Sequence, residues 1–247
     1  MKNLALLLLV SMPLEASVFG YVQSASQSGN SALPFGSNNT AGNAILVFTS
    51  TASGGASSAV TDTQGNSYTA IIINAQSPAG INVWLAQNIK SGANSVTATG
   101  LNSSGAGSSI AIVEVTTPAT TKYAVLNCQT ENGTTNPFGC NATTDIIAPG
   151  EVFTLQACYD FANGHTWTGT NLTIRQTVQE GGGQTLGVGT NEYTSGITAG
   201  TVSEILGCSN GGSNRCSYGG VQLVSTPTGS GGASPSSSAF VGLPFMQ

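Results

Sequence analysis

The sequence predicts an all-β protein, an antiparallel β-sandwich of two sheets with a jelly-roll-like topology. Short runs rich in Val, Ile, Thr, Tyr and Phe alternate with clusters of Gly, Ser, Asn and Pro. Helical periodicity is almost absent. The runs recur roughly every 10 to 15 residues, a spacing typical of two packed antiparallel sheets. The chain, 247 residues long, can bury a sizeable core within one such domain.

The predicted strands follow one another along the chain between turns. In two of these turns, Gly65 and Gly92 are expected to supply backbone angles that other residues avoid, while Asp62 and Asn94 cap the chain reversals. The expected strands are 20–26, 43–51, 57–62, 67–74, 81–88, 94–100, 109–116, 122–128, 151–160, 171–178, 185–194, 201–208 and 219–226.

The first segment of the chain has the pattern of a secretory leader. Lys2 precedes an apolar run that is too short to span a bilayer, and small residues follow Pro13. We expect a cleaved leader over residues 1–20, with cleavage after Gly20, or alternatively after Ala16, and no membrane span afterwards. The sandwich domain is then expected over 21–226, in a secreted protein at or outside the cell surface.

The last segment changes in composition. Residues 227–238 are rich in Gly, Ser and Pro and predict a flexible linker, and residues 239–247 form an apolar tail. The tail either adds a strand to its own sandwich, stays frayed, or pairs with the open edge of a second copy and so supports self-association.

Charge excludes one class of partner. Only 6% of residues are charged, with 5 basic and 10 acidic residues and a net charge of −5. Nucleic-acid binding needs clustered Lys and Arg to release counterions, so we expect no nucleic-acid partner. A surface of hydroxyls and amides suits an extracellular wall component, fibre subunit or glycan binder.

Five cysteines agree with an oxidising compartment. Two pairs bracket polar loops and are candidates for disulfides, with the pairing left open among three possibilities. Cys158 stands in an apolar run and is expected to be a buried thiol. The paired candidates are Cys128 with Cys140 and Cys208 with Cys216.

Several motifs resemble a widespread group of secreted bacterial β-sandwich proteins. They are "TAGNAILVFTS", "VTDTQGNSYTAI", "VWLAQNIKSGANSVTATG" and "SIAIVEV", covering Thr40 to about Val115, with a weaker likeness toward "VQLV". The resemblance implies a jelly roll of the concanavalin-like type. That scaffold carries lectins, hydrolases and structural modules, so the resemblance implies little about function.

Catalysis is not expected. His165 is the one histidine, and no acid or nucleophile stands at a recognisable spacing from it. Asp160 and three glutamates, Glu114, Glu192 and Glu204, lack the E-x-D-x-x-E pattern of jelly-roll glucanases. We expect no enzyme activity, no cofactor and no metal site. Asp62 and Asn66 offer oxygen ligands for calcium, but a plain turn is the stronger interpretation.

Glu114 is expected to be partly buried, because it shares a strand face with Ile110 and Ile112. A buried carboxylate needs a partner, and Arg175 is the predicted partner in a structural ion pair.

Sugar binding is the strongest functional prediction. Shallow glycan sites set aromatic faces against sugar rings and polar side chains against hydroxyls. The candidate ligand-binding residues are Trp167, Asp160, Phe161 and His165, with "NGHTWTG" expected to be mainly a turn. Trp84 serves equally well as a packing residue. The predicted function is a secreted, non-catalytic module that binds carbohydrate. The alternatives are a structural or adhesive subunit that assembles through the apolar tail, and a glycan hydrolase.

Overall fold

The fold is known from a computed structural model that describes residues 19–29, 32–51, 57–74, 80–101, 107–117, 121–133, 138–146, 152–160, 166–180, 185–193, 200–209 and 214–225. These residues form sixteen strands and no helix, and their strand pairs are antiparallel. The all-β antiparallel fold predicted from the sequence is therefore confirmed.

Residues 20–116 fold as a jelly roll, called here the first roll. Its inner sheet has the order β1-β8-β3-β6-β5 and its outer sheet the order β2-β7-β4. Early in the chain, successive strands alternate between the two sheets, as in other jelly rolls. The strands are β1 (Gly20–Ser28), β2 (Leu33–Pro34), β3 (Ala44–Thr51), β4 (Ala59–Asp62), β5 (Thr69–Asn74), β6 (Gly80–Ala86), β7 (Ser95–Thr99) and β8 (Ser108–Thr116).

Residues 121–225 repeat this topology and form the second roll. Its inner sheet has the order β9-β16-β11-β14-β13 and its outer sheet the order β10-β15-β12. Adding eight to each strand number of the first roll reproduces both orders. The strands are β9 (Thr121–Gly133), β10 (Phe138–Ile146), β11 (Val152–Asp160), β12 (Thr166–Thr170), β13 (Thr173–Gln179), β14 (Thr185–Tyr193), β15 (Gly200–Ser209) and β16 (Asn214–Ser225).

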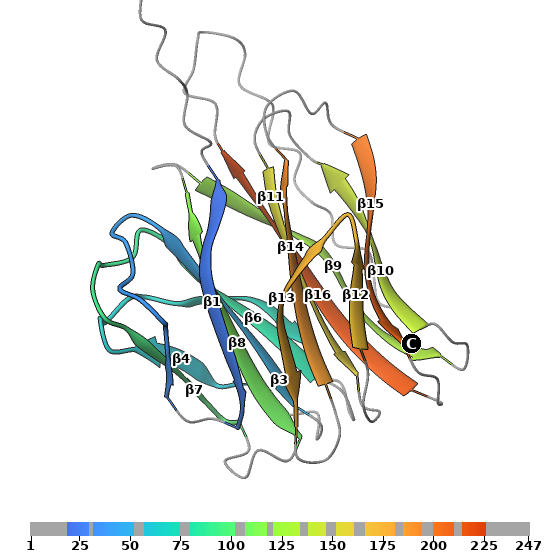
Figure 1. Ribbon diagram of the computed structural model, residues 1–247, viewed down its shortest axis with the longest axis horizontal. Helices are drawn as coiled ribbons and strands as arrows, with labels where there is room; N and C mark the ends of the chain where they lie inside the picture. The colour runs from blue at the N-terminus through green and yellow to red at the C-terminus, as the bar shows by residue number, and fades with distance from the viewer. Residues whose placement is uncertain are drawn as a thin grey trace, which may run out of the picture.

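The two inner sheets face each other and form the sandwich, with one outer sheet on each side (Figure 1). A first core fills the space between the inner sheets and includes Phe48, Val83, Val113, Leu186 and Leu223. A second core, with Ile45, Ile112 and Val96 among its residues, lies between the inner and outer sheets of the first roll.

The inner sheet of the first roll is thus covered on both faces. Every residue of β3 is buried, and so is every residue of β8 before Thr116. This explains why "SIAIVEV" is almost continuously apolar, since a strand covered on both faces has no solvent side for polar residues.

Sequence reasoning missed three strands. Strand β2 is very short and contains Pro34, a residue confined to sheet edges. Strand β10 begins at Phe138, inside the stretch between Cys128 and Cys140 that was expected to be a loop, and continues through polar residues to Ile146. Strand β12 contains Trp167, so the second half of "NGHTWTG" is a strand and not a turn.

Some predictions fall outside the described residues. The linker 227–238, the tail 239–247, Phe161 and His165 belong there, and so does the leader as far as residue 18. The expectations attached to them, and the domain boundaries, stay predictions. Phe19 and Gly20, assigned to the leader from the sequence, are part of the fold.

Candidate functional site

Glu114 is fully buried, and its carboxylate is held by four N–H donors. Oε2 accepts from Gln23 Nε2 and Asn39 Nδ2, both at 2.6 Å. Oε1 accepts from the Thr40 backbone N–H at 2.9 Å and from Asn43 Nδ2 at 2.7 Å. These donors replace the hydration that a carboxylate loses on burial. The cluster ties the β2–β3 connection to β8, and Glu114 has a structural role.

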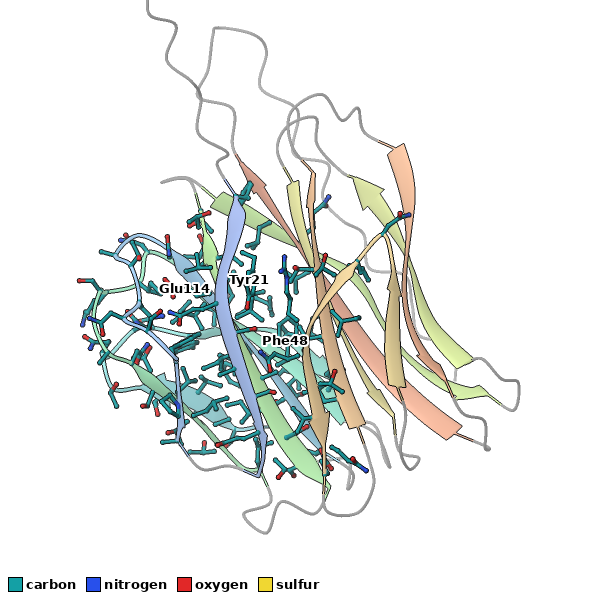
Figure 2. The ribbon with its side chains drawn as sticks, viewed as in Figure 1. Tyr21, Phe48 and Glu114 are labelled. Carbon is teal, nitrogen blue, oxygen red and sulfur yellow. The ribbon has the colours of Figure 1, made fainter. Side chains whose placement is uncertain are left out.

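The predicted ion pair between Glu114 and Arg175 is wrong. The Arg175 side chain donates from Nε to Thr190 Oγ1 at 2.8 Å, and its guanidinium lies 3.9 Å from the centre of the Tyr21 ring. Tyr21 packs against the first core, whereas Glu114 shares the opposite sheet face with Ile112 of the second core. Figure 2 shows Glu114 on the side of the inner sheet away from Phe48.

A β-bulge explains how Tyr21 and Gln23, two residues apart in β1, point to opposite faces of the inner sheet. Tyr21 pairs with Val115 and Gln23 pairs with Glu114, so Val22 is an extra residue in the strand. Without a bulge, residues two apart point to the same face. The insertion of Val22 leaves Tyr21 on the first core and turns Gln23 toward Glu114.

Asp62 is the centre of a second cluster. Its Oδ1 accepts from the Asn66 backbone N–H at 2.9 Å. Its Oδ2 accepts from Asn66 Nδ2 at 2.7 Å, Tyr68 Oη at 2.8 Å and Asn94 Nδ2 at 2.9 Å. Gly65 and Gly92 have φ values of 67° and 123°. The backbone angles expected at the two glycines and the capping role expected of Asp62 are therefore confirmed. The Asn94 side chain donates to Asp62 and accepts from Thr63 in that other turn and does not cap its own.

The Asp62 cluster has a defined protonation state. Burial raises the pKa of Asp62, but the hydrogen bonds from Asn66, Asn94 and Tyr68 outweigh it and hold the pKa below its ordinary value of 3.8. Burial, followed by the hydrogen bond to Asp62 and then by the Asp62 charge, raises the pKa of the Tyr68 phenol. At neutral pH the phenol is a donor and Asp62 an ionised acceptor. The groups around Asp62 are hydrogen-bond donors, which suits a capped turn rather than a cation site.

Lys90 closes the same turn against the β6–β7 connection. Its Nζ donates to the Gln64 and Gly65 carbonyls at 3.0 and 3.3 Å, and its backbone N–H donates to Asn66 Oδ1 at 2.9 Å. Among the described residues, no group of three or more His, Cys, Asp or Glu could hold a metal ion.

Trp84 is a packing residue of the first roll. It packs half-buried against the second core, and its indole N–H donates to Ser57 Oγ at 2.8 Å. Asn82, on the same face of β6, is fully buried, and neither atom of its amide finds a hydrogen-bond partner within the described part of the chain.

Two of the predicted ligand-binding residues lie at one end of the second roll. In the inner sheet, the backbone register forms one row across all the strands: Gln179, Thr185, Asp160, Cys216 and Glu131. In the outer sheet, the corresponding row is Phe138, Cys208 and Trp167.

Asp160 is the last residue of β11 and Trp167 is the second residue of β12, so both lie at the same end of the two sheets of one roll. Phe161 directly follows β11 and His165 directly precedes β12, outside the described residues. The rows also contain Cys208 and Cys216, one in each sheet.

The other cysteines occupy different positions. Cys128 pairs with Gly219 in the inner sheet, and Cys140 pairs with Leu206 in the outer sheet. Cys158 lies within β11, opposite Gly187 and Tyr218. The disulfides stay predictions.

Reasoning from His165 alone missed a G-x-S-x-G pattern, Gly207 to Gly211. In the structure, Ser209 is the last residue of β15 and pairs with Thr166, the residue after His165. The hydrolase elbow with this pattern needs a strand that leads into a helix. Here the strand is part of an antiparallel sheet, so the pattern lacks that structural context.

Sequence reasoning also missed the donors around Glu114. Their signal was the placing of Asn39 and Asn43 around "TAG", but nothing local linked them to a strand some 70 residues later. Gln222 is the counterpart of Glu114 in the second roll. Gln222 in β16 pairs with Thr154 in β11, as Glu114 in β8 pairs with Ile45 in β3. Gln222 is fully buried, and its amide atoms have no partner among the described residues.

Comparisons of the chain with family models, curated protein sequences and solved structures gave no match. The resemblance to secreted bacterial β-sandwich proteins stays a prediction. Within the described residues, no helix has the length and apolar character needed to cross a membrane.

Proposed function

We propose that this chain is a secreted, non-catalytic module that binds carbohydrate at the end of the second roll. The observation that carries the proposal is that Asp160 ends β11 and Trp167 stands near the start of β12, at the same end of the two sheets of that roll. An aromatic and a carboxylate at one end of a β-sandwich suit a sugar ring and its hydroxyls.

The two rolls support different roles. In the first roll, Glu114 and Asp62 are engaged by backbone and side-chain donors, and these contacts hold the loops at one end of that roll. In the second roll, the counterpart of Glu114 is a neutral Gln222. Gln222 pairs with Thr154 near the start of β11, and Asp160 lies six residues further along, at the other end of that strand. This leaves the second roll as the candidate for binding.

Low charge also supports a neutral ligand. With 6% charged residues, the chain has little means of holding an ionic partner, whereas amides and hydroxyls match the donors and acceptors of a neutral polysaccharide. Uncharged glycans are therefore the ligand class that this composition favours.

The test is binding of the secreted protein to a glycan array that contains neutral and acidic polysaccharide fragments. We expect binding to neutral glycans, and a loss of about tenfold or more in Trp167→Ala, because aromatic anchors dominate such contacts. Trp84→Phe, which changes the packing tryptophan of the first roll, is the matched control and should bind as the wild type does.

Two outcomes contradict the proposal. Absence of binding to every glycan removes carbohydrate as the ligand. Hydrolysis of a glycan or acyl ester by the wild type, lost in Ser209→Ala or Asp160→Asn, removes the non-catalytic assignment and gives the Gly207–Gly211 pattern a function.

A further inference from the structure

The described chain begins inside the folded core. Phe19 is 3% exposed and belongs to the first core, between the two inner sheets. Gly20 pairs with Thr116 at the start of β1, and its carbonyl accepts from Thr116 Oγ1 at 3.3 Å. Cleavage after Gly20, which the sequence pattern favours, would remove both of these residues from the folded protein.

The second roll shows that this extension belongs to the repeated topology. In the first roll, Tyr21 pairs with Val115, and Gly20 pairs with the next residue of β8. In the second roll, Tyr123 pairs with Leu223, and β9 begins two residues earlier, with Thr121 opposite Ser225. Phe19 occupies the position that corresponds to Thr121. Strand β9 therefore extends two residues before its tyrosine, whereas β1 begins one residue before Tyr21 and Phe19 directly precedes it.

We propose that the leader is removed by hydrolysis of the peptide bond between Ala16 and Ser17, so that the mature chain begins at Ser17 and keeps Phe19. This inference rests on the proposed secretion. A signal peptidase adds water across that bond, which leaves a carboxylate on Ala16 and an amino group on Ser17. Ala16 supplies the small residue immediately before the bond, whereas Leu14 departs from the A-x-A pattern, so the choice of this bond rests on the folded product.

The cleavage site is constrained by the stability of the folded product, not by the accessibility of the peptide bond. Signal peptidases cut the chain as it is translocated, before the sheets assemble, so burial of Phe19 does not block a cut after Gly20. Such a cut would instead produce a chain that lacks a buried aromatic side chain between the inner sheets. Loss of a buried Phe leaves a cavity and is among the more damaging core changes.

The test starts with the full chain expressed in a secreting bacterial host, followed by intact-mass measurement and N-terminal sequencing. We expect the exported protein to begin at Ser17. A start at Tyr21 would overturn the inferred site and leave the proposed secretion intact. A chain retained in the cytoplasm with Met1 would overturn the secretion and the cleavage together.

Two variants locate the bond. Ala16→Leu places a bulky residue before the proposed bond and should abolish processing there. Gly20→Leu alters the competing site equally and should leave the N-terminus at Ser17. The reverse result, with processing sensitive to Gly20→Leu alone, contradicts the proposal.

A second measurement, which needs no export, tests whether Phe19 stabilises the folded protein. Two chains made without the leader, starting after an initiator Met at Ser17 or at Tyr21, are compared by urea unfolding. We expect a lower midpoint for the chain that starts at Tyr21, and a similar loss for Phe19→Ala in the longer chain. Equal midpoints for all three would show that Phe19 contributes nothing and would overturn the inference.

Discussion

At the scale of residues, two carboxylates of this protein are surrounded by neutral hydrogen-bond donors rather than by cations. Glu114 and Asp62 each accept four hydrogen bonds from backbone N–H groups, Asn, Gln or Tyr. Such donors are neutral, so they stabilise the charge without adding a second buried ion that would itself need solvation. A chain with five Lys and Arg residues has few alternatives.

Glu114→Gln tests the first cluster. The variant keeps the shape of the side chain but turns one acceptor atom into a donor that faces Asn and Gln donors. We expect the free energy of unfolding to fall by about 3 kcal/mol, because buried donors lose their acceptor. Urea unfolding measures the change. Thr61→Ala, on the exposed side of β4, is the control, and a Glu114→Gln midpoint as high as that of the control would contradict the structural role.

Asp62→Asn tests the second cluster through pH. The pKa of Asp62 is lower in the folded protein than its ordinary value of 3.8. Its charge therefore contributes stability that is complete above this value and is lost as pH falls through the folded pKa.

The difference in unfolding free energy between the wild type and Asp62→Asn should be constant from neutral pH down to about pH 5 and should shrink below about pH 4. Urea unfolding at a series of pH values measures it. A difference that grows on acidification would contradict the assigned direction of the pKa shift.

At the scale of elements, bulges and a glycine decide how the inner sheets meet. Arg175 is the extra residue of a bulge in β13, and Ile71 is the extra residue of a bulge in β5. Beside the first of these, Gln176 donates from Nε2 to Ser24 Oγ and accepts from Ser26 Oγ, both at 2.6 Å. The bulges thus occur in corresponding strands of the two rolls, and the one in β13 joins β1 to β13 across the sandwich.

Gly219 permits the close approach of β16 to the first roll. A Cβ atom at this position would lie 3.1 Å from Ile72 Cδ1 and 3.4 Å from Val83 Cγ2. Gly219→Val should lower the free energy of unfolding by about 2 kcal/mol, because overpacking forces the sheets apart. Gly36→Val is the matched control, since a Cβ there would meet no atom within 4 Å. Thermal unfolding measures both, and equal melting temperatures would contradict the close approach.

At the scale of the whole molecule, the two rolls share one core. The first core takes Phe48 and Val113 from the first roll and Val188 and Val221 from the second. Neither inner sheet can keep these side chains dry without the other. The duplicated topology therefore does not make two independent units, and we expect the rolls to unfold together.

The two tryptophans report on this directly, because Trp84 is in the first roll and Trp167 in the second. In Trp84→Phe and in Trp167→Phe, fluorescence of the remaining tryptophan should change over the same urea range as the circular dichroism of the whole chain. Coincident transitions are the mark of two-state unfolding. Separate transitions in either variant would contradict the shared core.

Much of this fold could be predicted from local sequence. Alternation and turn residues located most strands, and the glycine turns at Gly65 and Gly92 were predicted with their geometry. Strands β10 and β12 were missed because their residues are polar or follow Gly, and their pairing with β15 comes from far along the chain. The duplication was missed because the rolls share strand order and not sequence.

The residues of the candidate site could likewise be predicted only in part from the sequence. Sequence chemistry indicated Asp160 and Trp167, but only the pairing of β11 and β12 shows that they lie in different sheets at the same end of the roll. The partner of Glu114 was predicted wrongly because a cation is the usual counterpart of a buried carboxylate. Nothing in the chain between Asn43 and Glu114 indicates that amides surround it.

By itself, the sequence determined the class of the fold, the place of most strands and the turns that need glycine, because each depends on neighbouring residues. Tertiary structure alone decided the face on which Glu114 and Arg175 lie, the burial of Phe19 and the pairing of two rolls through one core. These depend on strand register and on sheets that meet from distant parts of the chain, and a single inserted residue such as Val22 reverses the face of every residue that follows it in the strand.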